Sequence, residues 1–150
     1  MDAHRFAFIV CSNNKTYFET CRKFILNLQV PEGYSVDVIA MNGAESITEA
    51  YQSAMLSSEA KYKVYLHQDT FILKDTFIQE CLDIFNAHTE IGLLDVIGAD
   101  WLRRDGNIYK YWNLGGTLIC NSEFLGITNF QPAFSMENER FVYAEAVDGM

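Results

Sequence analysis

Three consecutive residues, His67, Gln68 and Asp69, follow the apolar run at 62–66 and have side chains that suit metal chemistry. A carboxylate is a preferred ligand of Mg²⁺, and Mn²⁺ also tolerates an imidazole. In an extended segment, positions 67 and 69 face the same way, so His67 and Asp69 are expected to converge on one ligand. A strand that ends in such residues presents them at the carboxyl edge of a sheet, where open α/β folds bind ligands.

Both side chains also have ordinary structural roles. An Asp directly after a strand often serves as a loop residue or a helix cap. A single His is often a packed, hydrogen-bonded imidazole. The metal hypothesis for His67 and Asp69 therefore depends on the elements and motifs that surround them.

An alternation of strand and helix patterns positions these residues. Continuous apolar runs are typical of strands covered on both faces, and apolar residues at helical spacing indicate the helices. The predicted strands cover residues 6–11, 36–41, 62–66 and 91–99. The predicted helices cover residues 15–28, a segment that begins at a capping box of Ser46 and Glu49, and 75–87. This order favours an α/β fold with a mostly parallel sheet.

The pattern is weaker beyond residue 105. We expect residues 108–112 to pair with 117–120 about Gly115 and Gly116, and a last strand over 141–147. Tyr109, Tyr111 and Trp112 suit a sugar-stacking platform, and packing of a hairpin explains them equally. Arg103 and Arg104 suit either a diphosphate contact or a solvated turn.

The bulk composition limits the classes of function. The chain has 150 residues, of which 49% are hydrophobic, and it shows no linker or repeat, so we expect one domain over 1–150. A formal net charge of −9 argues against nucleic acid as a partner, because such binding relies on Lys and Arg.

The first apolar run, 6–11, is too short for a signal peptide or a membrane span. With no CxxC pair among the four cysteines, we expect a cytoplasmic protein with reduced thiols.

The block AKYKVYLHQDTFI at 60–72, with Ala50 and Tyr51 before it, closely resembles the streptomycin-biosynthesis-type branch of family 2 glycosyltransferases. Segments 91–92, 96–98 and 146–149 resemble later blocks of that family. The resemblance implies a GT-A-like, Rossmann-like three-layer sandwich with a mostly parallel central sheet. It also implies that the chain is a single nucleotide-sugar-binding domain that ends, at Met150, before the acceptor-side region.

The resemblance implies a role for the residues after the third strand. Asp69 matches the final carboxylate of the family's DxD-like element, which is expected to hold Mn²⁺ or Mg²⁺ against the diphosphate of a nucleotide sugar. His67 stands where many relatives have Asp, so it is expected to be a second metal ligand or a donor contact. A UDP-sugar is the first expectation for the donor.

The resemblance also implies a nucleotide pocket at the three strand ends. Residues after the first strand match positions that contact the base and ribose, and residues after the second match a loop that usually carries an Asp. The expected nucleotide-binding residues are Cys11, Ser12, Asn13, Asn42, Glu45, His67 and Gln68.

The implied reaction is attack by an acceptor hydroxyl on the anomeric carbon of the donor sugar, with inversion of configuration. A general base must lie within hydrogen-bond reach of that hydroxyl, and Asp148 is the remaining candidate carboxylate. The acceptor is a glycan or a small molecule.

Two other functions remain open. The chain is alternatively a non-catalytic nucleotide-binding or regulatory module on a degenerate GT-A scaffold, because His67 replaces Asp and the acceptor half is missing. A structural or oligomerising domain, such as a homodimer, also explains the chain, because an incomplete sheet leaves apolar surface in need of cover. The residues expected on that surface are Phe124, Phe130, Phe134 and Phe141.

Overall fold

The computed structural model describes residues 1–99, 114–115, 120–122, 127–130, 143–144 and 146–147. Contacts divide the chain into two compact units, one over residues 1–92 and one over 93–149. Each unit is described by itself below. A single domain over 1–150 stays a prediction.

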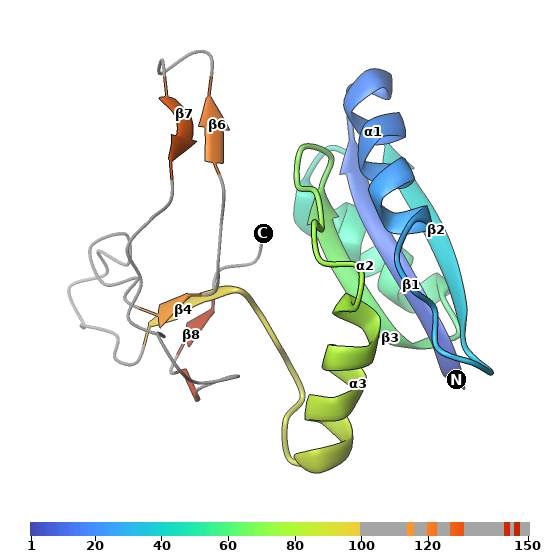
Figure 1. Cartoon of the computed structure of the whole chain (residues 1–150). Coiled ribbons are helices and arrows are strands. Elements are labelled where there is room, and N and C mark those ends of the chain that lie inside the picture. Colours follow the sequence, from blue (N-terminus) through green and yellow to red (C-terminus); the bar gives the residue numbers. More distant parts are fainter. Residues whose placement is uncertain (100–113, 116–119, 123–126, 131–142, 145, 148–150) are drawn as a thin grey trace. The chain divides into compact units, whose positions relative to one another are not determined.

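The first unit contains a three-stranded parallel sheet (Figure 1). Its strands are β1 (Asp2–Ser12), β2 (Ser35–Asn42) and β3 (Ala60–His67), in the order β2-β1-β3. Ser12 pairs with Asn42, and Cys11 pairs with His67. All three strands therefore end at the same edge of the sheet, as the sequence predicts.

Three helices connect and follow these strands: α1 (Lys15–Leu26), α2 (Ile47–Ser57) and α3 (Phe77–Ala87). The predicted cap of α2 is confirmed, because the Ser46 hydroxyl accepts a hydrogen bond from the Glu49 amide at 3.1 Å. The chain moves from β1 to β2 through α1 and then back across β1 to β3 through α2. Right-handed crossovers in opposite directions require these two helices on opposite faces of the sheet.

The side chains of β1 confirm the three layers, since they alternate between two buried faces. Phe6, Phe8 and Val10 belong to a core cluster that α1 and α3 complete on one face. Ala7 and Ile9 are equally buried but lie outside that cluster, and α2 contacts β1 and β2. The two faces of the sheet thus carry α1 and α3 on one side and α2 on the other (Figure 1). This α/β architecture agrees with the expected GT-A-like fold class.

The described residues of the second unit include short antiparallel pairs. β4 (Ile97–Ala99) pairs with β5 (Leu114–Gly115) and with β8 (Ala146–Val147), and β6 (Cys120–Ser122) pairs with β7 (Ile127–Phe130). Gly115 lies opposite Ile97 within this pairing, so the prediction of a turn at that residue is wrong.

Two predicted strands are shorter than expected. Residues 91–96 form no strand, and β4 begins only at Ile97. The prediction assumed that this apolar run is covered on both faces. Leu93 is 65% exposed, so the assumption does not hold. The strand expected over 141–147 includes only Ala146 and Val147 among the residues that the structure describes.

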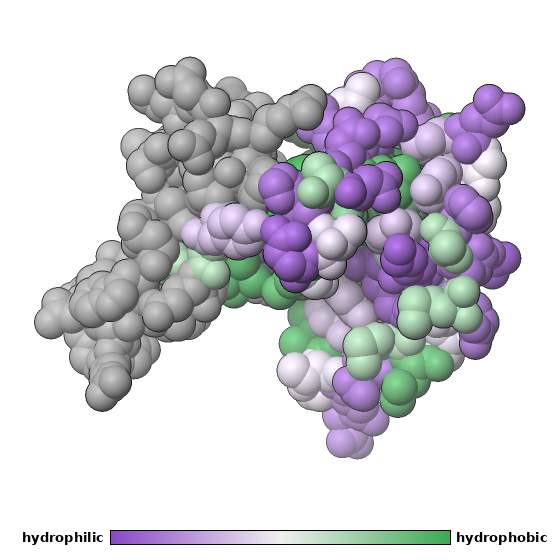
Figure 2. All heavy atoms as spheres, turned by 90° about the horizontal axis from the view of Figure 1, so that it is seen from below, coloured by the Kyte–Doolittle hydropathy of each residue, from purple (hydrophilic) through white to green (hydrophobic). Residues whose placement is uncertain are grey.

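The surface of the first unit is largely hydrophilic on the face shown in Figure 2, with apolar side chains between the charged ones. Exposed large apolar residues include Leu56 and Leu73. The phenylalanines expected at a dimer surface have side chains outside the described part, so a homodimer stays a prediction. Within the described ranges, no helix is long and apolar enough to cross a membrane.

Candidate functional site

The connection between β1 and α1 is short and well satisfied in hydrogen bonds. The Asn14 side-chain oxygen accepts from the amides of Thr16 at 3.0 Å and Tyr17 at 3.2 Å. This is N-cap geometry, in which a side chain replaces the missing partners of the first helical turn. Residues 12–14 are therefore fixed at the carboxyl edge of the sheet by the start of α1.

Gln68 connects this loop to the end of β3. Its side-chain oxygen accepts hydrogen bonds from the Ser12 hydroxyl at 3.0 Å, the Asn13 amide at 3.1 Å and the Asn14 amide at 2.8 Å. Its side-chain nitrogen donates to the Asn13 side-chain oxygen at 2.8 Å. Both ends of the carboxamide are thus engaged by the loop, and a contact of Gln68 with a ligand stays a prediction.

The chain turns directly after β3. The Thr70 amide donates to the His67 carbonyl at 3.1 Å, which closes a β-turn with Gln68 and Asp69 at its centre. The argument that positions 67 and 69 face the same way is therefore wrong, because it assumed that the strand continued to Asp69. His67 and Asp69 are both exposed, and their joint role as metal ligands stays a prediction.

The backbone on the far side of Asp69 is held against α1. The Cys21 thiol donates to the Thr70 carbonyl at 3.3 Å, and the Phe71 ring stacks on Phe24 with 5.2 Å between ring centres. Burial, with a smaller contribution from the Asp69 carboxylate, raises the pKa of Cys21 to about 11. Asp69 therefore sits between anchored neighbours, and its carboxylate has no hydrogen bond or ion pair with any residue that the structure describes.

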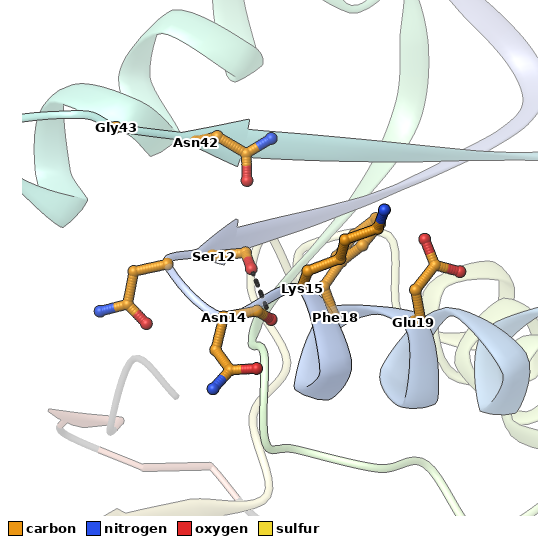
Figure 3. Close-up of a pocket in the computed structure, with 8 residues that line it drawn as sticks. Ser12, Asn14, Lys15, Phe18, Glu19, Asn42 and Gly43 are labelled. Carbon is orange, nitrogen blue, oxygen red and sulfur yellow. Dashed lines mark hydrogen bonds between the residues drawn. The ribbon is translucent and has the colours of Figure 1, made fainter.

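A hollow of about 590 Å³ opens where β1 and β2 end beside the first turns of α1 (Figure 3). The sequence predicted three of its lining residues, Ser12, Asn13 and Asn42. The complete lining is Ser12, Asn13, Asn14, Lys15, Phe18, Glu19, Asn42 and Gly43. Cys11, Glu45, His67, Gln68 and Asp69 are not part of it. The hollow is therefore lined by residues at the ends of β1 and β2. The predicted residues that follow β3 do not line it, although Gln68 is hydrogen-bonded to the loop between β1 and α1.

Sequence reasoning missed three residues of α1 that line the hollow, namely Lys15, Phe18 and Glu19. Their spacing of three and four residues places them on one helix face. That spacing, counted from the predicted helix start, is the signal that could have identified them. Lys15 and Glu19 bring one charge of each sign to the hollow, so its side chains are nearly neutral in sum.

The remaining predicted residues lie apart from the hollow. Cys11 is half-buried on the α2 face, where burial and then the Cys11 thiol raise the pKa of Tyr51 to about 12. Glu45 is exposed in the loop before α2. Asp148 lies outside the described residues, as do Arg103, Arg104 and the aromatic residues at 109–112.

The described residues contain no group of three or more His, Cys, Asp or Glu side chains that could hold a metal ion. Mg²⁺ usually binds through one or two carboxylates, with substrate phosphates and water completing its coordination. One exposed, anchored carboxylate at Asp69 fits that type of site. The Asp69 carboxylate is therefore compatible with a cation whose other ligands are phosphate oxygens and water.

Comparison with protein-family models gives a match over residues 7–150 to a family described as "Glycosyltransferase like family". No curated protein and no solved structure matches the chain. The streptomycin-biosynthesis-type branch and the missing acceptor-side region stay predictions. Because the match extends over nearly all of the sequence, including β2, β3 and the second half of β1, the chain belongs to the glycosyltransferase-like family.

Proposed function

We propose that the chain binds a nucleotide-diphosphate sugar, in the first place a UDP-sugar, and transfers the sugar to an acceptor hydroxyl with inversion. The observation that carries the proposal is the shared edge of the sheet, where β1, β2 and β3 end at Ser12, Asn42 and His67. Open α/β sheets bind ligands at this edge. Membership of the glycosyltransferase-like family supports a sugar donor as that ligand.

The hollow suits the nucleoside part of the donor. Its volume of about 590 Å³ falls in the range of small-molecule sites, which is roughly 300 to 1,000 Å³. Asn13 and Asn42 each supply a carboxamide, which offers both a donor and an acceptor to the edge of a base or a ribose. Phe18 adds an apolar ring to the lining, and Figure 3 shows it on α1 with Lys15 and Glu19.

The diphosphate needs positive charge, and Asp69 with His67 would hold the divalent cation that supplies it. When bound, such a cation offsets the negative charge that develops on the departing diphosphate. The chain's own contribution is to keep the Asp69 carboxylate exposed on an anchored turn. Lys15, at the start of α1, offers a second positive charge to the phosphates.

Inversion requires a single displacement, so a base must receive the proton of the acceptor hydroxyl as that oxygen attacks. We assign this role to Asp148, which follows β8 directly in the sequence. Tyr51 is unsuited to it, because its hydroxyl donates to the Leu66 carbonyl at 3.1 Å and its pKa is raised to about 12. We further propose a cytoplasmic location, supported by free thiols at Cys11, Cys21 and Cys81.

The test is calorimetric titration of the protein with UDP in the presence of Mn²⁺, for the wild type and for Asp69→Asn. We expect binding by the wild type and at least about tenfold weaker binding by Asp69→Asn, since about 1.4 kcal/mol of cation affinity is lost with the charge. Asp83→Asn on α3 is the matched control, because that exposed carboxylate lies outside the site. Absence of binding with UDP and with GDP, or full affinity in Asp69→Asn, would refute the proposal.

A second candidate function is a nucleotide-binding module without transferase activity. It is favoured by the hollow itself, because its lining excludes His67 and Asp69 and so does not need a cation. This alternative expects UDP to bind equally well with and without Mn²⁺. It also expects neither sugar transfer nor hydrolysis of a UDP-sugar.

A further inference from the structure

We propose that Gln68 is a positioning residue that couples the nucleotide loop at 12–14 to the turn that carries Asp69, so that nucleotide and cation bind cooperatively. The inference rests on the proposed function, because it concerns the two ligands of that site. In this inference Gln68 acts through the loop and through Asp69, its neighbour in the chain.

The first observation is where the backbone pairing stops. β1 and β3 are neighbours in the sheet, and their register ends at Cys11 and His67. The next residues of each strand leave the sheet in different directions, β1 toward α1 and β3 into the turn. In the described part of the chain, the hydrogen bonds between residues 12–14 and residues 68–69 all involve the Gln68 carboxamide. Farther along each segment, the Cys21 thiol of α1 donates to the Thr70 carbonyl.

The second observation is how completely the carboxamide is used. Its oxygen accepts from the Ser12 hydroxyl and from the amides of Asn13 and Asn14, and its nitrogen donates to the Asn13 side chain. The residues joined are 54 to 56 positions apart in the sequence. Only a side chain with both an acceptor and a donor makes this set, so Glu preserves part of it and Leu preserves none.

The third observation is what lies at each end of the connection. Ser12, Asn13 and Asn14 line the hollow that the proposal assigns to the nucleoside. Asp69 follows Gln68 directly and occupies the next position of the same β-turn. A shift of the loop therefore moves the backbone that bears the Asp69 carboxylate, and the reverse holds too.

The consequence is a linkage between two binding events. If the nucleotide orders the loop and the cation orders Asp69, each ligand makes the other's site more favourable. Such coupling is reciprocal and typically changes each affinity by about 5- to 150-fold. We define the coupling factor as the Kd for UDP without Mn²⁺ divided by the Kd with Mn²⁺.

The test compares wild type, Gln68→Leu, Gln68→Glu and the control Gln29→Leu. Gln29 also makes a side-chain hydrogen bond between distant segments, to Asp75, but it lies away from the hollow. Two quantities are measured in each variant: the coupling factor by titration calorimetry, and deuterium uptake by the peptide that contains residues 12–17.

We expect Gln68→Leu to reduce the coupling factor at least about fivefold and to speed deuterium uptake at 12–17. Gln68→Glu keeps the three accepted hydrogen bonds, so its uptake should stay closer to that of the wild type. Gln29→Leu should match the wild type in both measurements. A merely structural role would lower the stability of Gln68→Leu and leave its coupling factor unchanged, which would overturn the inference.

Two further outcomes separate this inference from the proposed function. If the wild type binds UDP with Mn²⁺ but uptake at 12–17 is the same in Gln68→Leu, the inference fails alone. If the wild type binds UDP neither with nor without Mn²⁺, the proposed function fails and the coupling fails with it. If Gln68→Leu does not fold, the same two measurements are made on Gln68→Glu. The inference is overturned if Gln68→Glu takes up deuterium faster than the wild type at 12–17 but keeps the coupling factor of the wild type.

Discussion

Replacing Asn14 by Asp separates the structural role of this residue from its place beside the proposed diphosphate. Asn14 caps α1 with its side-chain oxygen, and its backbone amide donates to Gln68. Asp caps helices as well as Asn does, and the backbone hydrogen bond is unaffected by the change. The substitution therefore keeps the geometry of the loop and adds one negative charge at its centre.

The added negative charge should stabilise the folded protein and weaken the binding of a phosphate ligand. A negative charge at a helix N-terminus stabilises the helix by about 0.3 to 1 kcal/mol when exposed, and Asn14 is exposed. A diphosphate about 8 Å away, whose charge the bound cation reduces to about one negative unit, would instead be repelled by about 1 kcal/mol at an effective dielectric constant of about 40. We thus expect unchanged or slightly greater stability and about fivefold weaker binding of UDP.

Stability is measured by urea denaturation followed by circular dichroism, and affinity by calorimetry with UDP and Mn²⁺. Gln52→Glu is the matched control, because it adds the same charge at an exposed position of α2, on the other face of the sheet. The loss of affinity in Asn14→Asp should shrink at high salt, since the screening length falls to about 3 Å at 1 M. Equal affinities of Asn14→Asp and Gln52→Glu at low salt would show that the diphosphate does not lie at this loop.

Two further predictions concern the folding of the first unit. Phe8→Ala should lower the free energy of unfolding by about 3 to 5 kcal/mol, because the Phe8 side chain is 0% exposed in the core. A loss below about 1 kcal/mol, measured by urea denaturation, would contradict this packing. Stability should also fall as pH rises from 9 to 11, because unfolded thiols release their protons near pH 9 while burial holds the pKa of Cys21 and Cys81 at about 11. Cys21→Ala should make that decline shallower in urea denaturation at each pH, and an unaltered slope would count against the burial of this thiol.

The sheet of the first unit was predictable because its signal is local. The residues from Phe6 to Val10 are all apolar, and all of them are buried, as a strand between two helical layers requires. The cap at Ser46 was predictable for the same reason, since its partner is only three residues away. Patterns of this kind report which faces of an element are covered, and they need no knowledge of distant contacts.

The role of Gln68 was not predictable in that way. Its partners lie 54 to 56 residues away and become neighbours only through the parallel pairing of β1 with β3. The orientation of Asp69 was inferred from a period of two, which holds only within a strand, and β3 ends at His67. Both residues lie at the place where regular structure stops, so side-chain hydrogen bonds decide the geometry there.

The electrostatics of this edge explain why the proposed function depends on a cation. The whole chain carries a formal net charge of −9, and Glu19 offsets Lys15 in the hollow. Free amides at the start of a helix often bind phosphate, but the amides of Asn13 and Asn14 already donate to Gln68. The charge that a diphosphate requires must therefore come from outside the loop. Under the proposed function, the exposed carboxylate of Asp69, anchored beside that loop, is the group that would recruit the cation.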